Sequence, residues 1–413
     1  MKLSGIETHE HLQAIKKGMV MNMNNKNWVS VWGNAVSIAE HHPEAYAKYI
    51  TLRYPVYIPF AGDTLRFTFD NYCGSEAVTV TRATVSAATS PVYEKMPLAC
   101  PCKKETICDI TFSKNESVTM EAHQTAVSDP VSFPVKKGMT LTVSLYFADF
   151  TLMQSAVLVT GPLSKGFFSL GDQTHADALP MDTTKTTNWF YFLSNIELMT
   201  AEENHTVICY GDSITAGAWP DYLTLLARQN PDNHTAFIRR ATSGSRVLRQ
   251  YECITYDSYG LKGTNRFPHE IPTTGADTVI IQQGINDIIH PVGIETNPFR
   301  PMSDLPTAKE LIDGYRYYIE EAKKLHLKVY IGTLLPIFGW RTYATFRDDL
   351  RNELNAWIRS AKEIDGCIDF DLALRGSENP SAFREGFDSG DHLHPSSKAY
   401  QAMAECAYEV LQR

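Results

Sequence analysis

Residues 209 to 217, CYGDSITAG, carry a serine that could act as a nucleophile. Ser213 follows an apolar run and lies in a turn bounded by glycines, so two roles are open to it. It could cap the helix that follows, which is the ordinary role of a serine after a strand. It could also attack a carbonyl carbon, provided that a neighbouring base takes its proton, because a neutral hydroxyl is a weak nucleophile. The other polar segments of the chain decide between these roles.

The segment DHLHP, residues 391 to 395, offers a base together with a carboxylate. Asp391 and His394 are three residues apart, so one turn of chain places both side chains on the same side. A histidine can accept the serine proton when a carboxylate holds it in the right tautomer. His392 is one residue out of phase and is expected to point elsewhere. We therefore expect Ser213, His394 and Asp391 to be the catalytic residues.

Three N–H groups could stabilise the oxyanion that forms when Ser213 attacks. The backbone N–H of Ser213 lies at a helix start, and that of Gly244 belongs to a residue that permits close approach. Asn286, in GIND, offers a side-chain amide. Taken alone, Gly244 and Asn286 could be turn residues. In combination with a nucleophile and a base, they predict an oxyanion hole formed by Ser213, Gly244 and Asn286.

From residue 205 onward, apolar runs of strand length alternate with segments of helical spacing. The expected strands are 205–211, 235–241, 276–284, 327–336 and 366–371, and the expected helices are 219–229, 306–325, 344–363 and 396–412. This alternation predicts a parallel sheet with helices on both faces. Ligands bind at the carboxyl ends of the strands in such sheets. The segments that carry Ser213, Gly244, Asn286 and His394 are therefore expected to meet at one sheet edge.

Residues 27 to about 195 have a different pattern, in which short runs such as YITLRYPVYI and MTLTVSLYF alternate apolar and polar side chains between turn residues. Such runs predict an antiparallel β-sandwich, jelly-roll-like in form. A chain of 413 residues is longer than one core usually supports. We expect two domains, residues 1–200 and 201–413. The connection NIELMTAEEN, near residues 195 to 204, is not a flexible tether by composition, so the domains are expected to pack rigidly.

The C-terminal half resembles the SGNH hydrolases, also called the GDSL esterase family. Four blocks of that family occur in order: GDSIT with Ser213, SGSR with Gly244, GIND with Asn286, and DHLHP with Asp391 and His394. One block alone is weak, but four in order are specific. The resemblance implies a flavodoxin-like three-layer α/β/α fold and ester hydrolysis without a metal or cofactor. The serine block departs from the G-x-S-x-G elbow, which disfavours the α/β-hydrolases.

Longer segments such as GDSITAGAWPDYL and FDSGDHLHPSSKAY are similar to acylhydrolases found beside xylan-degrading enzymes in gut and rumen bacteria. Those proteins often have a β-sandwich before the catalytic domain, so this similarity covers most of the chain. Many relatives have Asp after GDSIT, whereas this chain has Ala216, a change expected to alter the pocket rim. The resemblance implies hydrolysis of short-chain acyl esters. The expected acyl group is acetyl carried on a carbohydrate, and the expected substrate is a small-molecule or oligosaccharide ester.

Two alternatives stay open. A lipase or thioesterase of the same fold would need an extended apolar groove, and the proline-rich NPFRPMSDLP favours neither alternative. A catalytically inactive carbohydrate-binding protein would be expected to lack a catalytic residue, and this chain lacks none of them. The aromatic segment NWVSVWGNAVS is read as core, with a sugar platform as the lesser alternative.

Other polar and aromatic side chains near the four blocks have two readings each. Arg246 and Trp219 are possible substrate-binding residues or packing residues. Asp212 and Asp287 are expected to bond loop backbone. The cysteine cluster CPCKKETIC lacks the usual C-x2-C pairing, so free thiols are expected rather than a metal site.

The net charge of −9, from 38 basic and 47 acidic side chains, argues against nucleic acid or an anionic membrane as a partner. No apolar segment reaches the roughly 18 to 20 residues of a membrane span. The first 25 residues have no apolar core of signal-peptide type, so a cytoplasmic location is expected, and a leader ahead of them would change that expectation. The oligomeric state is left open.

Overall fold

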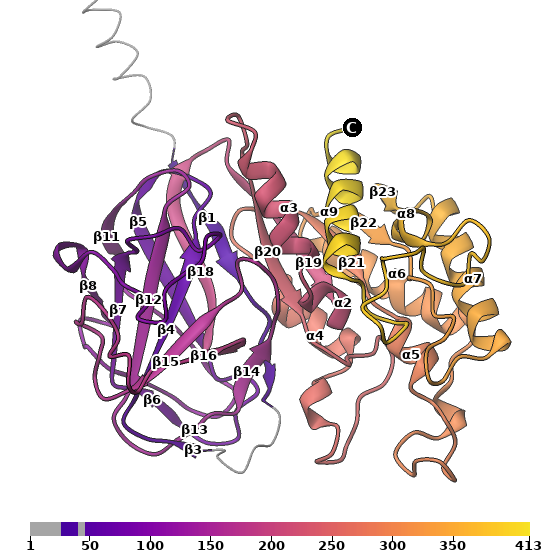
Figure 1. Ribbon diagram of the computed structural model, residues 1–413, viewed down its shortest axis with the longest axis horizontal. Helices are drawn as coiled ribbons and strands as arrows, with labels where there is room; N and C mark the ends of the chain where they lie inside the picture. The colour runs from indigo at the N-terminus through magenta and orange to yellow at the C-terminus, as the bar shows by residue number, and fades with distance from the viewer. Residues whose placement is uncertain (1–25, 40–45) are drawn as a thin grey trace, which may run out of the picture.

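The computed structural model describes residues 26–39 and 46–413. Figure 1 shows two halves side by side along the long axis, one built of antiparallel strands and one of alternating strands and helices. The chain passes from the first half to the second between β18 (Leu193–Ala201) and β19 (His205–Gly211). Residues 1–25, which the signal-peptide expectation concerns, lie outside the described residues.

The antiparallel half contains two large sheets packed on a common core. One has the order β1-β18-β5-β10, with β11 also paired to β5, and the other has the order β16-β15-β4-β12-β7-β8. Their strands are β1 (Lys26–Gly33), β4 (Ile50–Tyr57), β5 (Gly62–Asp70), β7 (Arg82–Ala87), β8 (Cys108–Ile110), β10 (Thr125–Val127), β11 (Val131–Val135), β12 (Thr140–Phe147), β15 (Gly166–Leu170), β16 (Lys185–Thr187) and β18. Phe67 of β5 and Val143 of β12 belong to the same fully buried cluster. The antiparallel prediction is confirmed, and the jelly-roll-like connection stays a prediction.

Smaller sheets complete this half. They are formed by β2 (Ser37–Ile38), β3 (Tyr46–Ala47), β6 (Val78–Val80), β9 (Val118–Met120), β13 (Thr151–Leu152), β14 (Ser155–Leu158) and β17 (Trp189–Tyr191). The aromatic side chain of Trp32 packs against Phe190, with ring centroids 5.7 Å apart. Trp32 is therefore a packing residue, in agreement with the core reading of its segment.

The expected connection near residues 195 to 204 is wrong for most of its length. Residues 193–201 form β18, which lies inside a sheet between β1 and β5. Nearly every residue of β18 is buried, because one face meets the antiparallel core and the other lies toward the second half of the molecule. A strand that is buried on both faces loses the apolar–polar alternation that marks a half-exposed strand. The link between the halves is residues 202–204.

The second half is a five-stranded parallel sheet in the order β20-β19-β21-β22-β23. Besides β19, its strands are β20 (Thr235–Ala241), β21 (Ala276–Gln282), β22 (Lys328–Gly332) and β23 (Gly366–Ile368). Numbered along the chain this is the order 2-1-3-4-5 of flavodoxin-like sheets. Val279, Ile280 and Ile281 of β21 are fully buried, as both faces of the sheet are covered. The predicted α/β architecture is confirmed.

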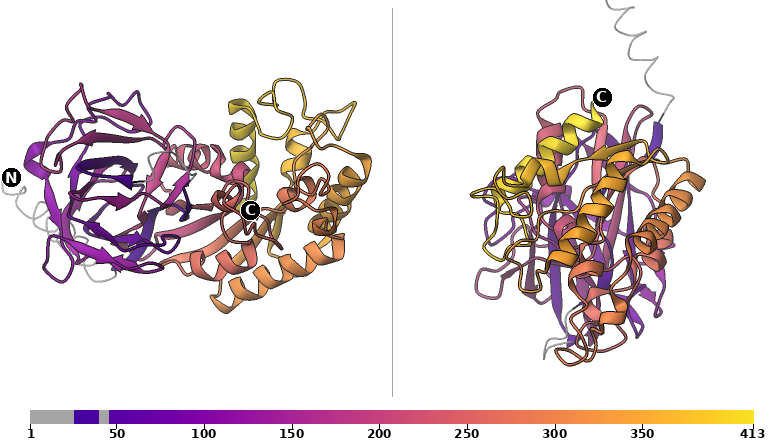
Figure 2. Two further views of the ribbon diagram at one scale, coloured as in Figure 1. Left: turned by 90° about the horizontal axis from the view of Figure 1, so that it is seen from below. Right: turned by 90° about the vertical axis from the view of Figure 1, so that its right-hand side faces the viewer.

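Helices flank this sheet on both faces (Figures 1 and 2). The α-helices are α2 (Ser213–Ala216), α3 (Trp219–Arg228), α4 (Gly263–Glu270), α5 (Ile285–Ile289), α6 (Ala308–Lys324), α7 (Thr345–Ser360), α8 (Phe370–Leu374) and α9 (Ser397–Leu411), with short 3-10 turns η1 (Lys104–Thr106), η2 (Asp257–Tyr259) and η3 (Met302–Asp304). Helix α3 packs against α9, whereas α6 packs against α4 and α7. The two helix layers thus support the carboxyl ends of the strands, where α2 and α5 begin.

The two halves bury polar and apolar groups against each other. Ala216, Ala236 and Ala241 of the α/β half belong to the apolar cluster of the antiparallel half. The buried guanidinium of Arg240 donates to the carbonyl of Asn34 at 2.7 Å and to that of Ser194 at 3.0 Å. These contacts agree with the expected close packing of the halves.

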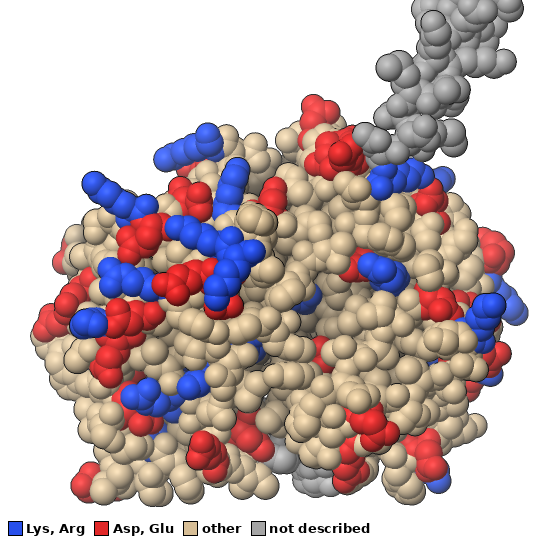
Figure 3. Space-filling model, turned by 180° about the vertical axis from the view of Figure 1, so that it is seen from behind, with Lys and Arg blue, Asp and Glu red and all other residues tan. Residues whose placement is uncertain are grey.

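The surface carries charges of both signs. Figure 3 shows acidic and basic side chains interspersed over one face of the molecule. None of the helices in residues 26–39 and 46–413 has the length and apolar character needed to cross a membrane.

Candidate active site

Ser213 is the first residue of α2, which is separated by one residue from the end of β19, the second strand in the order of the parallel sheet. Asp212 caps this helix, and its carboxylate accepts the N–H of Ile214 at 3.1 Å. Ile214 is buried while Ser213 is partly exposed, so the short helix is anchored in the core and presents its serine at the surface. The capping role that was open to Ser213 therefore belongs to Asp212.

Ser213, His394 and Asp391 form a continuous chain of hydrogen-bonding groups. The distance from Ser213 Oγ to His394 Nε2 is 2.9 Å, and that from His394 Nδ1 to Asp391 Oδ2 is 2.6 Å. A proton on Nδ1 satisfies the second contact and leaves Nε2 to accept from the serine hydroxyl. His392 instead places its Nδ1 2.5 Å from Asp388, so it points elsewhere, as predicted.

The loop holds Asp391 in its ionised form. Its Oδ1 accepts the backbone N–H groups of Leu393 at 3.0 Å and His394 at 2.8 Å. Partial burial acts to raise the pKa of Asp391, but the hydrogen bonds from the His394 side chain and these N–H groups outweigh it and hold the pKa at about 2. The carboxylate is thus a fixed acceptor for the Nδ1 proton of His394 at neutral pH.

The predicted oxyanion donors Gly244 and Asn286 follow β20 and β21, the strands on either side of β19. Asn286 is buried on α5, and one of its amide hydrogens is donated to the carbonyl of Ser245 at 3.1 Å. This bond ties the two loops together and leaves a second amide hydrogen for another acceptor. Gly244 has a φ of +78°, and a Cβ there would lie 2.3 Å from the ring of Tyr259. A glycine is therefore needed for both backbone conformation and space.

The third predicted donor, the N–H group of Ser213, lies in the first turn of α2. Helix N-termini leave their first N–H groups without intrahelical partners. The N–H groups of Thr215 and Ala216 bond the Asp212 carbonyl, and that of Ile214 bonds the Asp212 side chain. Ser213 is the first-turn residue whose N–H has no acceptor among the described residues. A free N–H group at a helix start is the kind of donor that can stabilise an oxyanion.

Two buried carboxyl groups organise the loops around this site, as expected. Asp287 accepts the N–H groups of Val247 at 2.7 Å and Leu248 at 3.0 Å, which fixes the loop after Gly244. Burial raises the pKa of Asp287 to about 6 and that of Asp212 to about 7. The carboxyl groups of both residues accept hydrogen bonds from backbone N–H groups.

Three residues considered for the substrate pocket or its rim are buried in the structure. Trp219 is fully buried, donates its indole N–H to Thr215 at 3.3 Å and packs against Phe370, so it does not reach a substrate. Arg246 is 2% exposed and pairs with Asp304 at 3.1 Å, so the packing reading holds for both. Ala216 lies in the buried interface with the antiparallel half and not on a pocket rim.

A cluster of aromatic side chains beside the predicted oxyanion donors was not foreseen. Tyr259 lies against Gly244, and its ring centroid is 5.3 Å from that of His290. His290 follows Asn286 by four residues, which places both on one face of α5. The hydroxyl of Tyr251 lies 3.2 Å from His290 Nδ1. The four-residue spacing in GINDIIH is the signal that could have identified His290.

The cysteine cluster has no metal-site geometry in the described part of the chain. Cys100, Cys102 and Cys108 are free cysteines. No group of three or more His, Cys, Asp or Glu side chains among the described residues is arranged to hold a metal ion.

Comparisons with known proteins identify a family for the second half of the chain. Residues 209–402 match the GDSL-like Lipase/Acylhydrolase family. No curated protein is significantly similar to the chain.

Solved structures resemble about half of the chain at low identity. A GDSL-like lipase from Bacteroides thetaiotaomicron is 20% identical over 51% of this chain and 89% of its own, with a TM-score of 0.37. A putative acylhydrolase from Bacteroides fragilis is 20% identical over 50% of this chain and 86% of its own, with a TM-score of 0.36. An acetylxylan esterase from Geobacillus stearothermophilus is 17% identical over 50% of this chain and 93% of its own, with a TM-score of 0.36.

The family match spans all four sequence blocks, from the strand before Ser213 to the helix after His394. Residues 209–402 are therefore a domain of the GDSL-like lipase/acylhydrolase family, and the protein is an ester hydrolase of the GDSL type.

Proposed function

We propose that this protein hydrolyses short-chain acyl esters with Ser213 as nucleophile, His394 as general base and Asp391 as the residue that orients the base. The observation that carries the proposal is the continuous contact from Ser213 Oγ to His394 Nε2, 2.9 Å, and from His394 Nδ1 to Asp391, 2.6 Å. A serine beside a histidine that is held by a carboxylate is the arrangement that activates a hydroxyl.

The first step transfers the Ser213 proton to His394 Nε2 while Oγ bonds the ester carbonyl carbon. Negative charge then develops on the former carbonyl oxygen, and the N–H groups of Ser213, Gly244 and Asn286 stabilise it. Collapse of the tetrahedral intermediate breaks the bond to the alcohol oxygen, which takes the proton from His394. The acyl group stays on Ser213 as an ester.

The second step returns the enzyme to its starting state. His394 takes a proton from water, whose oxygen attacks the acyl carbon of the acyl-enzyme. The second tetrahedral intermediate uses the same three donors. Its collapse releases the carboxylic acid and returns the proton to Ser213 Oγ. The atoms and charges of ester plus water thus balance those of acid plus alcohol.

The expected substrate is an acetyl ester on a carbohydrate. The similarity of the blocks around Ser213, Asn286 and His394 to acylhydrolases found beside xylan-degrading enzymes supports this substrate class. The partly exposed position of Ser213 and the 33% exposure of the His394 side chain leave the reacting atoms open to a large alcohol such as an oligosaccharide.

The test is a panel of p-nitrophenyl esters from acetate to palmitate, beside acetylated xylo-oligosaccharides. We expect the rate to fall with chain length and acetate to be released from the oligosaccharides. Ser213→Ala and His394→Ala should abolish activity, whereas His392→Ala, on the same loop but paired with Asp388, should keep it. Full activity in Ser213→Ala would refute the nucleophile, and a maximum at long acyl chains would favour a lipase or thioesterase.

A further inference from the structure

The loop between β14 and β15, residues 159–165, belongs to the antiparallel half but contacts the helix that carries Ser213. We call it the bracing loop. Its Thr160 N–H donates to the carbonyl of Ala216, the last residue of α2, at 2.9 Å. The last carbonyls of a helix have no intrahelical partner, so this bond holds the far end of a helix only four residues long. Ser213 is the first residue of that same helix.

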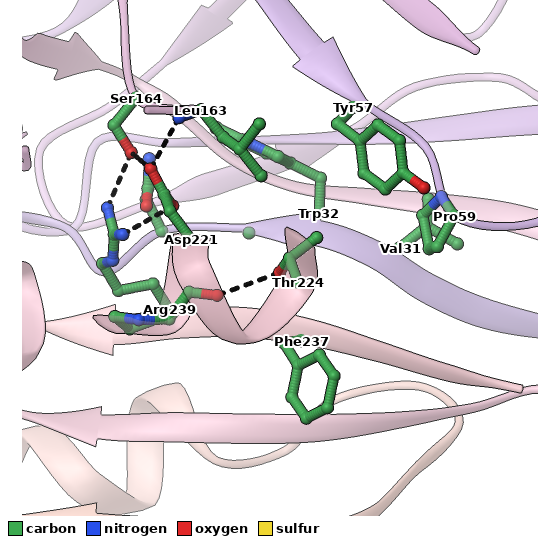
Figure 4. Close-up of a pocket in the computed structure, with 13 residues that line it drawn as sticks. Val31, Trp32, Tyr57, Pro59, Leu163, Ser164, Asp221, Thr224, Phe237 and Arg239 are labelled. Atoms are coloured by element: carbon green, nitrogen blue, oxygen red, sulfur yellow. Dashed lines mark hydrogen bonds and ion pairs between the residues drawn. The ribbon is translucent and has the colours of Figure 1, made fainter. Parts of the chain in front are cut away.

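The bracing loop also binds the start of α3 through a buried network (Figure 4). Asp221, in the first turn of α3, accepts the N–H of Leu163 at 2.8 Å and the hydroxyl of Ser164 at 2.9 Å. Arg239 of β20 donates to the other oxygen of Asp221 at 2.7 Å and to Ser164 Oγ at 2.9 Å. These side chains are all nine-tenths buried or nearly so, where charge-assisted bonds hold their geometry firmly.

The approach of the loop to α3 leaves no spare room. Gly161 has a φ of +152°, and a Cβ at this position would lie 2.2 Å from the carboxylate of Asp221. The loop backbone is therefore packed directly on the side chain that it binds. A shift of the loop cannot occur without a shift of α3.

The same helix pair contacts the element that follows the catalytic histidine. The hydroxyl of Tyr222 on α3 lies 2.7 Å from that of Ser397, the first residue of α9 and three residues after His394. Gly217, between α2 and α3, packs on Tyr400 of α9, whose hydroxyl would lie 2.2 Å from a Cβ there. The α2–α3 junction is thus enclosed between the bracing loop and the helix that anchors His394.

We propose that the bracing loop holds Ser213 within hydrogen-bonding distance of His394, with Ser164 and Asp221 as positioning residues that act through α2 and α3. The antiparallel half is then part of the catalytic apparatus and not an appended module. This inference rests on the proposed role of Ser213 as nucleophile. Small displacements of a nucleophile reduce the rate of the chemical step without weakening substrate binding.

The test compares Ser164→Ala with Ser144→Ala in the full chain. Ser144 is a matched control, because its buried Oγ also accepts from an arginine, Arg53 at 2.9 Å, but within the antiparallel half. With p-nitrophenyl acetate we expect Ser164→Ala to lower kcat about tenfold or more at unchanged KM. The rate at which diisopropyl fluorophosphate modifies Ser213 should fall in parallel. Ser144→Ala should keep both rates.

A second pair of variants tests the backbone bond. Thr160→Pro removes the N–H that binds Ala216, whereas Thr160→Ala keeps it and changes only an exposed side chain. We expect kcat to fall in Thr160→Pro but not in Thr160→Ala. This pair tests the bracing role even if Ser164→Ala does not fold. Equal kcat and equal modification rates in test and control variants would overturn the bracing role. Full activity in Ser213→Ala would instead refute the proposed function, so the two failures are distinguishable.

Discussion

The Asp391 carboxylate lies 2.6 Å from Nδ1 of His394 and accepts two backbone N–H groups of the same loop with its other oxygen. One side chain thus fixes both the loop and the ring that the loop carries. The local fold of residues 391–394 thus fixes the Nδ1 side of the imidazole, and Ser213 contacts its Nε2 side.

We expect Asp391→Asn to lower kcat by about 10⁴, because an amide can donate to Nδ1 and so moves the imidazole proton to Nε2, where Ser213 needs an acceptor. Steady-state kinetics with p-nitrophenyl acetate measures this loss. Asp388→Asn is the control, since that carboxylate pairs with His392 on the same loop. Equal kcat in the two variants would refute the orienting role.

The pKa of Asp391 also predicts how stability depends on pH. The folded-state pKa of about 2 lies below the ordinary value of roughly 3.9, so the carboxylate stabilises the native state fully above the unfolded pKa. That contribution is lost as pH falls toward 2. We expect the unfolding midpoints of wild type and Asp391→Asn to differ by a constant amount above about pH 5 and to converge between pH 4 and pH 2. The effect is modest because the side chain is 42% exposed, and a gap that persists at pH 2 would contradict this account.

The parallel sheet was predictable because its strands are continuous apolar runs between helices of regular period. The run 205–211 became β19 with the predicted bounds. Helix α4 was missed since Gly263 and Pro268 weaken its intrinsic preference, and it forms because Phe267 packs on Tyr210 and Tyr318. Tertiary packing supplied what local sequence could not indicate.

The reactive residues of the candidate site could be predicted because their side-chain types determine their chemistry. Ser213, Asp391 and His394 were identified from a hydroxyl, a base and a carboxylate at suitable spacing, and the structure brings them together. Ala216 was misplaced because its apolar neighbours come from the antiparallel half of the chain. A contact between two halves leaves no periodic signal in either one.

Asn286→Ala should lower kcat on the order of 10²–10³ with little change in KM, because an oxyanion donor acts only once the charge has formed. Its control is Asn355→Ala, a buried asparagine of the same half whose amide also donates to a backbone carbonyl, that of Leu334 at 2.8 Å. We expect that control to lose stability but to keep kcat in its folded fraction. A rise in KM at constant kcat for Asn286→Ala would assign this residue to ground-state binding.

Gly244→Ala should inactivate the enzyme, and a steric clash should contribute to this loss in addition to backbone strain. A left-handed φ costs a non-glycine residue about 1–2 kcal/mol. Gly138 also has a φ of +78°, so an alanine there would bear the same cost, but its Cβ would lie 4.0 Å from the nearest atom. Gly138→Ala should therefore lower the free energy of unfolding and keep kcat. Gly244→Ala adds a Cβ 2.3 Å from the Tyr259 ring, so either the ring or the Gly244 N–H must move away from the oxyanion position. Replacing Tyr259 by alanine in the Gly244→Ala variant should restore part of kcat by making room for the methyl group. Equal kcat in the two glycine variants would show that the backbone of Gly244 has no part in the oxyanion hole.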